Sequence, residues 1–210
     1  MQKKIAIIAN GTINDHDFHK KILKESDVLI CADGGANIAK QLDIFPHYII
    51  GDLDSIKPMV LDYFKKQGES KIIKDTNQDK TDLELAIDLA QTLNPSEIKI
   101  YAALGNRIDH TLANIYCLDK ISGEISAEIV DEKTSIKMIK KGTEIKGEKN
   151  EIVSVIGLSN VSNLNYKGFK WNVKNLCTKP GWFGISNKML SDKANIDFSE
   201  GKIIVIKVRR

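Results

Sequence analysis

The chain has 210 residues, 42% of them hydrophobic and 28% charged, which is enough to bury a core and argues against a disordered protein. Its 31 basic and 28 acidic residues leave a net charge of +3 with scattered lysines, which argues against nucleic-acid binding. Three distant cysteines without a CxxC pair indicate neither a disulfide framework nor a zinc site. The apolar run at 5–9 is too short for a signal peptide or a membrane span, so we expect a cytoplasmic protein without membrane contact.

Apolar runs and helical patterns alternate in the first part of the chain. Runs without clean alternation at 4–9, 27–32, 48–51, 71–74 and 97–103 are typical of strands that are buried on both faces of a parallel sheet. Helical spacing between them is clear over 80–93 and 108–120 and weaker over 35–42 and 57–67. This series predicts an α/β domain with a doubly wound parallel sheet.

The pattern changes near Ser122 and Gly123. Short strand-like segments follow at 126–131, 135–140, 151–157, 169–176 and 202–208, without a further good helix. We therefore predict a second domain, a small all-β sandwich or barrel, and divide the chain into residues 1–124 and 125–210.

Acidic residues stand where several predicted strands end. Asp33 precedes two glycines, Asp52 and Asp54 lie two positions apart, the segment 75–82 is polar and acidic, and Asp109 follows the last strand of the series. The carboxyl ends of parallel strands meet at one edge, so these carboxylates should converge on the crevice where such sheets bind ligands. Clustered carboxylates repel one another and suit Mg²⁺ with polyphosphates, which indicates phosphate chemistry.

The first two acidic segments each have a purely structural alternative. Gly34 and Gly35 would let a phosphate approach backbone N–H groups at a helix start, but a tight turn explains them equally well. Asp52 and Asp54 project the same way from an extended stretch, and we favour a shared hard cation over a surface turn.

The later segments are open to the same question. Thr81 and Asp82 would complement the dipole of the following helix, which is a complete structural explanation, and Lys80 could meet phosphate or solvent. Arg107 could bind phosphate oxygens through its fork of donors or form an ion pair with Asp109.

Four of these segments, in this order and spacing, resemble the thiamine pyrophosphokinase family: DGGAN at 33–37, GDLDS at 51–55, DKTD at 79–82 and GNRIDH at 105–110. GFKWN at 168–172 and GISN at 184–187 are similar to the thiamine-side signatures of that family. Asn106 departs from the pattern, because the family more often has a second glycine before the arginine. Asn tolerates left-handed backbone geometry, so we expect the loop to persist.

The resemblance implies an α/β nucleotide domain, a β-sandwich thiamine domain and a homodimer whose sites are shared between subunits. It implies transfer of a pyrophosphoryl group from ATP to the hydroxyl of thiamine, with Mg²⁺, giving thiamine diphosphate and AMP. Two rival readings stay open, a thiamine or nucleotide sensor without turnover and another Mg²⁺-dependent phosphotransferase on the same fold.

Site residues follow from matching the family's motifs. We expect Asp52, Asp54 and Asp82 to be the catalytic and metal-binding residues, with Asp82 or Asp54 accepting the proton of the thiamine hydroxyl. The nucleotide and phosphate set is Asp33, Asn37, Gln78, Thr81, Arg107 and Asp109.

For thiamine we expect Trp171 to stack on the cationic ring, against the alternative of a tryptophan in the sandwich core. Ser186 and Asn187 are expected to have a lesser polar role at the same site. Trp182, beside Pro180 and Gly181, has the surroundings of an aromatic residue in a surface loop.

Overall fold

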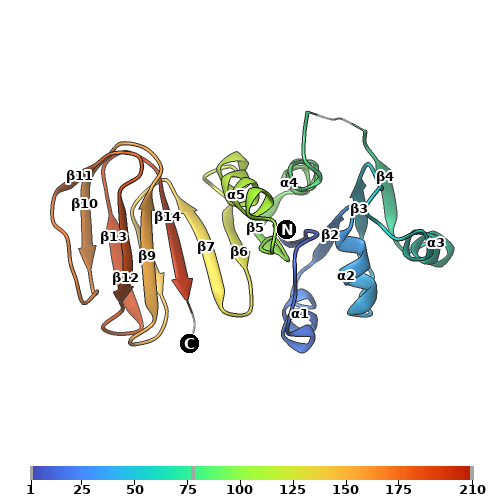
Figure 1. The fold of residues 1–210 in the computed structure, drawn as a ribbon, viewed down its shortest axis with the longest axis horizontal. Helices are drawn as coiled ribbons and strands as arrows, with labels where there is room; N and C mark the ends of the chain where they lie inside the picture. The colour runs from blue at the N-terminus through green and yellow to red at the C-terminus, as the bar shows by residue number, and fades with distance from the viewer. Residues whose placement is uncertain (1, 77–78, 209–210) are drawn as a thin grey trace. The chain divides into compact units, whose positions relative to one another are not determined.

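The computed structural model describes residues 2–76 and 79–208. The chain divides into two compact units, the first ending at Glu132 and the second beginning at Lys133. The first unit mixes helices with parallel strands, and the second consists of antiparallel strands (Figure 1). The predicted fold class, an α/β domain followed by an all-β domain, is confirmed.

The sheet of the first unit has the strand order β6-β5-β1-β2-β3-β4, and its neighbouring strands run parallel. Every residue of β2 is buried, as expected for an apolar strand that is covered on both faces. The strands predicted for this domain are therefore confirmed within two or three residues at their ends. The strands of this sheet are β1 (Lys3–Ile8), β2 (Val28–Ala32), β3 (Tyr48–Gly51), β4 (Lys71–Lys74), β5 (Pro95–Tyr101) and β6 (Ser126–Val130).

The order of the strands reverses at β1. Strands β2, β3 and β4 follow β1 toward one edge of the sheet, whereas β5 returns to the other side of β1 and β6 continues in that direction. The connections that leave the carboxyl ends of β1 and β5 therefore lead to opposite faces of the sheet. A crevice forms between such connections, and open α/β sheets bind their ligands there.

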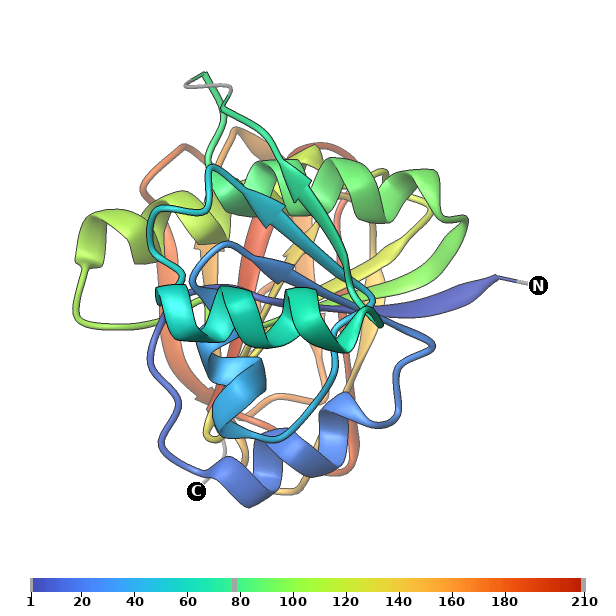
Figure 2. The same cartoon turned by 90° about the vertical axis from the view of Figure 1, so that its right-hand side faces the viewer.

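Helices cover both faces of this sheet. Figure 1 shows α1 and α2 on one face and α4 and α5 on the other, and Figure 2 shows α1 and α4 on opposite sides of the strands. Helix α4 packs against β1, β2, β3 and β5. The sheet is therefore doubly wound, as predicted. The helices are α1 (His16–Leu23), α2 (Gly35–Gln41), α3 (Pro58–Gln67), α4 (Asp82–Thr92) and α5 (Ile108–Cys117), with a 3₁₀ turn at Leu118–Lys120.

The core under α1, α2 and α3 is formed by apolar side chains of these helices and of the strands. Leu23, Ile38 and Phe64 come from the three helices and pack in one cluster with Leu29 and Ile49 of the sheet. Each such side chain contributes about 1.5–3 kcal/mol when it is fully buried. This cluster fixes the strands whose ends carry the acidic residues.

Helix α1 was not expected from the sequence. It has eight residues and begins where the Asp15 side chain accepts a hydrogen bond from the backbone N–H of Phe18, 2.9 Å away. Phe18, Ile22 and Leu23 pack in the core beneath it, but eight residues are too few for the repeated apolar spacing that reveals longer helices.

The second unit consists of two antiparallel sheets with the orders β12-β9-β14-β7 and β11-β10-β13-β8. Their inner faces share one core, in which Val153 and Val205 of the first sheet pack in a cluster with Leu164 and Ile196 of the second. This is a sandwich. The strands are β7 (Thr134–Ile139), β8 (Thr143–Lys146), β9 (Ile152–Gly157), β10 (Val161–Lys167), β11 (Leu176–Thr178), β12 (Phe183–Lys188), β13 (Lys193–Asp197) and β14 (Ile203–Val208).

Two details of the predicted β-domain were wrong. Residues 126–131 were grouped with it, but β6 pairs parallel with β5 and belongs to the first unit. The strand predicted over 169–176 is largely absent from the described structure, because Gly168 (φ +84°) and Asn175 (φ +50°) interrupt the extended backbone. Strands β8, β10, β12 and β13 were not predicted.

None of the described helices is both long enough and apolar enough to span a membrane. Within the described part of the chain the cysteines are free, with Cys31 and Cys117 buried and Cys177 exposed.

Candidate phosphate and metal site

A cavity of about 740 Å³ opens at the carboxyl edge of the parallel sheet. It lies at the reversal between β1 and β5, where the topology places a ligand crevice. The segments that follow β1, β3, β4 and β5 and the first turns of α4 and α5 line it. Its lining includes Asp52, Asp75, Asp82, Arg107 and Asp109.

Three of the strand-end carboxylates converge beside this cavity. Asp33, Asp52 and Asp54 each offer an oxygen atom, and these atoms lie within 4.8 Å of one another. Asp33 is buried, Asp52 half-buried and Asp54 exposed, so the group reaches from the interior to solvent. The expected meeting of acids at one sheet edge therefore occurs for these three residues, and it brings Asp33, which was predicted for the nucleotide set, next to the predicted metal pair.

Asp33 is the most buried member, with 1% of its surface exposed. One oxygen, Oδ2, accepts a hydrogen bond from the backbone N–H of Ser55 at 2.9 Å, and Oδ1 has no partner among the described residues. Burial raises the pKa of this carboxyl, and the charges of Asp52 and Asp54 add to the effect against the hydrogen bonds from Ser55. A buried acceptor without a donor is what a bound cation would satisfy.

Asp82, the first residue of α4, joins the group next to Gly51 at the end of β3. Burial is the main cause that raises the pKa of its carboxyl, followed by the charges of Asp33 and Asp52, while a backbone hydrogen bond from Asp52 lowers it. Four carboxylates thus meet without a cationic side chain among the causes of the Asp33 and Asp82 shifts. Hard oxygen ligands in this number fit Mg²⁺, which carboxylates bind together with phosphate oxygens.

Gly51 makes the approach of Asp82 to Asp33 possible. It ends β3 at φ +148°, and a Cβ there would lie 2.6 Å from Asp82 Oδ1 and 2.8 Å from Asp33 Cβ. No side chain fits between the two carboxylates. The close approach of the two carboxylates therefore requires glycine at this position.

Replacing Gly51 by Ala should lower the free energy of unfolding by about 1–2 kcal/mol, since the backbone is strained for an L-residue and the methyl group displaces Asp82. Urea unfolding followed by circular dichroism measures the change. The matched control is Gly123→Ala, where a Cβ would meet no described atom within 4 Å. A Gly51→Ala protein as stable as this control would contradict the close packing.

The raised pKa of Asp82 predicts a pH-dependent gain in stability when its charge is removed. Because the folded chain holds the proton more tightly than the unfolded chain, ionised Asp82 destabilises the fold above the raised pKa. The effect fades as the pH falls below the ordinary value of 3.8. In EDTA at pH 7, Asp82→Asn should therefore gain on the order of 1 kcal/mol of unfolding free energy, and near pH 3 it should gain none.

Urea titrations at the two pH values make this comparison. Asp62→Asn removes an exposed carboxylate from α3 and serves as the control, with little change expected at either pH. An Asp82→Asn protein that is less stable than the wild type at pH 7 would show that its carboxylate is not under electrostatic strain.

Two residues of the predicted nucleotide set form hydrogen bonds to other residues of the chain. Asn37 donates from Nδ2 to the Ser55 carbonyl at 3.0 Å and accepts from the Lys57 N–H at 2.9 Å, so it ties α2 to the segment after β3. Thr81 caps α4 and forms a reciprocal capping box with Glu84. Gln78, predicted for the same set, lies outside the described residues.

Arg107 and Asp109 form the ion pair that the sequence left open. Arg107 donates from Nε to Asp109 Oδ1 at 2.9 Å and from Nη2 to Oδ2 at 2.6 Å, and both side chains are exposed. The guanidinium holds the pKa of Asp109 well below its usual range. Both residues line the cavity. An exposed ion pair contributes little to stability, so the Arg107 guanidinium could leave Asp109 and bind phosphate oxygens at a small cost in free energy. Asn106 itself is not among the described residues with a positive φ.

The segment 10–12 lines the cavity and was missed in the sequence. It follows β1, where Gly11 donates to the Ala102 carbonyl at 2.6 Å and Thr12 to the Leu104 carbonyl at 3.0 Å. A Cβ at Gly11 would lie 2.4 Å from both carbonyl oxygens, so the loop lies directly against the segment after β5. The position of Asn10 and Gly11 at the end of the first strand was the signal that could have revealed it.

In the second unit, Trp171 is 54% exposed, which excludes a place in the sandwich core. The buried Asn187 amide holds its backbone, donating to the Trp171 carbonyl at 2.6 Å and accepting from the Trp171 N–H at 3.1 Å. Lys170 Nζ lies 4.6 Å from the centre of the indole ring. The indole is therefore an accessible aromatic surface on a backbone that Asn187 holds.

Ser186 and Trp182 are the other two residues that the sequence singled out in this region. Ser186 is exposed, has φ +60° and donates its backbone N–H to Ser154 Oγ at 3.0 Å. Trp182 lies in the loop before β12, as expected, but it is half-buried and packs against the sandwich core.

Comparisons with known proteins agree with these features. The family description "Thiamin pyrophosphokinase, catalytic domain" matches residues 19–130, and "Thiamin pyrophosphokinase, vitamin B1 binding domain" matches residues 135–203. The thiamine pyrophosphokinase of Bacillus subtilis is 29% identical over 210 residues, 98% of each chain. Thiamine pyrophosphokinase 1 of Oryza sativa is 29% identical, over 86% of this chain and 78% of its own length. The crystal structure of thiamine pyrophosphokinase from Bacillus subtilis has a TM-score of 0.87 at 27% identity, with 99% of both chains covered.

Proposed function

The chain belongs to the thiamine pyrophosphokinase family, and from this premise we propose that it transfers a diphosphate group from ATP to the hydroxyl of thiamine. The products are thiamine diphosphate and AMP. The observation that carries the proposal is the convergence of Asp33, Asp52, Asp54 and Asp82 at a cavity on the reversal of the sheet.

The carboxylates would hold Mg²⁺ through Asp52, Asp54 and Asp82, and the partnerless oxygen of Asp33 supports adding it to this set. When bound, the ion neutralises phosphate oxygens, which is the main need of a phosphoryl transfer. The protein contributes to the placement of these oxygens, because the Ser55 N–H holds Asp33 and Gly51 leaves room for Asp82 beside it.

In the proposed reaction the thiamine hydroxyl oxygen forms a bond to the β-phosphorus of ATP, and the bond from that phosphorus to the oxygen bridging to the α-phosphorus breaks. AMP leaves with this oxygen. Asp82 or Asp54 is proposed to accept the hydroxyl proton, and we favour Asp82 because it is half-buried at the start of α4, whereas Asp54 is exposed to solvent.

The triphosphate is proposed to lie along the 10–12 segment and to reach Arg107. Thr81, Asp109 and Gln78 belong to the same proposed set by family motif. Asn37 is proposed to act indirectly, since both ends of its amide bind the protein. This assigns the nucleotide to the first unit and thiamine to the second, close to the division at 124 and 125 expected from the sequence.

Thiamine is proposed to stack on Trp171, with Ser186 beside it. We also propose a homodimer with sites shared between subunits. The support is exposed apolar surface in both units, with Ile108, Leu112 and Tyr116 along one face of α5 and Phe183 and Ile185 on β12.

One incubation tests the function. Purified protein with ATP, Mg²⁺ and thiamine should give thiamine diphosphate and AMP in equal amounts, and EDTA should abolish both. Release of ADP would indicate an ordinary kinase on the same fold, and ligand binding without AMP release would indicate a sensor.

A further inference from the structure

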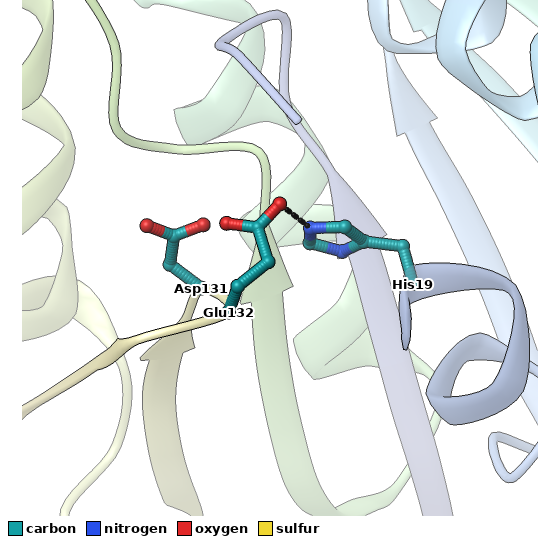
Figure 3. Close-up of side chains that lie close together, drawn as sticks. All are labelled: His19, Asp131 and Glu132. Carbon is teal, nitrogen blue, oxygen red and sulfur yellow. Dashed lines mark hydrogen bonds and ion pairs between the residues drawn. The ribbon is translucent and has the colours of Figure 1, made fainter. Parts of the chain in front are cut away.

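One carboxylate oxygen outside the proposed site collects several hydrogen bonds from a distant segment. Glu132 Oε1 accepts from the backbone N–H groups of Asn14 at 2.7 Å and Asp15 at 2.9 Å, and it lies 3.1 Å from His19 Nε2. Figure 3 shows the Glu132 carboxylate between the Asp131 carboxylate and the His19 ring. Asp131 and Glu132 follow β6, whereas Asn14 and Asp15 end the β1–α1 connection and His19 lies in α1.

The histidine side of this contact is rigid. His19 is 1% exposed, and its ring packs edge-on against Phe18 and Tyr101, with centroids 5.2 Å and 6.2 Å away. Its side chain therefore has little freedom to leave Glu132, whose own side chain is 14% exposed.

Glu132 is the charged member of the acidic pair. Burial and the hydrogen bond with Glu132 raise the pKa of Asp131 to about 6. Burial opposes the charge on Glu132 too, but the hydrogen bond with Asp131 and the N–H groups of Asp15 and Asn14 hold the pKa of Glu132 well below its usual range. A lasting negative charge therefore faces two backbone N–H groups just ahead of α1, where the helix dipole favours it.

The tethered backbone leads directly to the cavity. Asn14 and Asp15 end the connection whose earlier part, residues 10–12, lines the cavity. That earlier part is fixed by the bonds of Gly11 and Thr12 to carbonyls after β5. The connection is thus held at both ends, by the β5 segment at one end and by Glu132 at the other.

We propose that Glu132, locked by His19, is a positioning residue for the β1–α1 connection that the nucleotide's phosphates would contact. Neither side chain is among the described residues that line the cavity, so the action runs through the backbone of residues 10–15. The proposal rests on the proposed function, because it assigns the nucleotide to this cavity.

A metal site is the competing use of these side chains, since one ligand atom each of His19, Asp131 and Glu132 lies within 4.8 Å of the others. Hydrogen bonds already occupy Glu132 Oε1, and an ion held between this oxygen and His19 Nε2 would have to replace the contact between them. We therefore favour the tether and make ion binding an outcome of the test.

Glu132→Ala and Glu132→Gln test the tether, with Glu124→Ala as the control that removes an exposed carboxylate from the same unit. Glu132→Ala should raise the KM for ATP about tenfold, because a displaced loop no longer presents its contacts, and should change the KM for thiamine less than twofold. Glu132→Gln keeps an acceptor oxygen and should recover most of the loss. His19→Gln keeps a donor and should behave like Glu132→Gln.

Calorimetric titration with a non-hydrolysable ATP analogue separates this proposal from the proposed function, because it needs no turnover. Weaker analogue binding to Glu132→Ala, with wild-type binding to Glu124→Ala, supports the tether even if thiamine is not the acceptor. Unchanged analogue binding overturns it, as do equal effects on both KM values. Stoichiometric binding of Zn²⁺ that is lost in Glu132→Ala, with analogue affinity intact, assigns the cluster to a metal instead. If Glu132→Ala does not fold, Glu132→Asp carries the test, because its side chain is one methylene shorter and draws the carboxylate back from the Asn14 and Asp15 N–H groups. Glu132→Asp should then bind the analogue more weakly than the wild type, and unchanged binding overturns the proposal.

Discussion

Asp52→Asn and Asp54→Asn should each lower the rate of AMP release at least about 100-fold, while the fold persists. Each change removes a negative oxygen from the group formed with Asp33, within 4.8 Å, and so weakens the hold on the metal and phosphate. Each also relieves repulsion among carboxylates, so unfolding should occur at the same or a higher urea concentration.

The measurement is steady-state AMP release over a range of Mg²⁺ concentrations. Asp62→Asn, on the exposed side of α3, makes the same chemical change away from the group and should keep wild-type rates. If either variant works at the wild-type rate at limiting Mg²⁺, the residue that was changed does not belong to the proposed metal site.

Trp171→Ala should raise the KM for thiamine roughly 10- to 100-fold and leave the KM for ATP nearly unchanged. Stacking of a flat ring on an indole contributes about 1–3 kcal/mol, and the cationic ring of thiamine adds attraction to the indole face. Since Trp171 is 54% exposed, its removal costs little core packing.

Initial rates with each substrate varied in turn separate the two KM values. Trp171→Phe keeps an aromatic face and should recover much of the thiamine affinity. If Trp171→Ala weakens both substrates equally, the indole is a structural element and thiamine binds elsewhere.

The parallel sheet could be predicted because its signals are local. Each residue of β2 is apolar and buried, and α4 carries regular apolar spacing behind a Thr81–Glu84 capping box. Topology then placed Asp52 and Asp54 at the ligand edge, since strand ends in a parallel sheet share one side.

The features that were missed depend on contacts between distant residues or on irregular backbone. Helix α1 is short, and the tether from Glu132 to Asn14 spans 118 positions, so no local pattern indicates either. Strands β10 and β12 contain Asn163 (φ +56°) and Ser186 (φ +60°), and such residues break the alternation that reveals a strand. The residues of β6 suit either domain, and only its pairing with β5 decides its place.

The reversal of the sheet also sets the order in which a growing chain can complete it. Ile5 of β1 pairs with Ile98 of β5, so one edge of β1 stays open during synthesis until β5 has left the ribosome. The crevice borders the same two strands. A nascent chain that has already made β1 to β4 therefore holds Asp33, Asp52 and Asp54 but lacks the segment after β5 that completes the cavity.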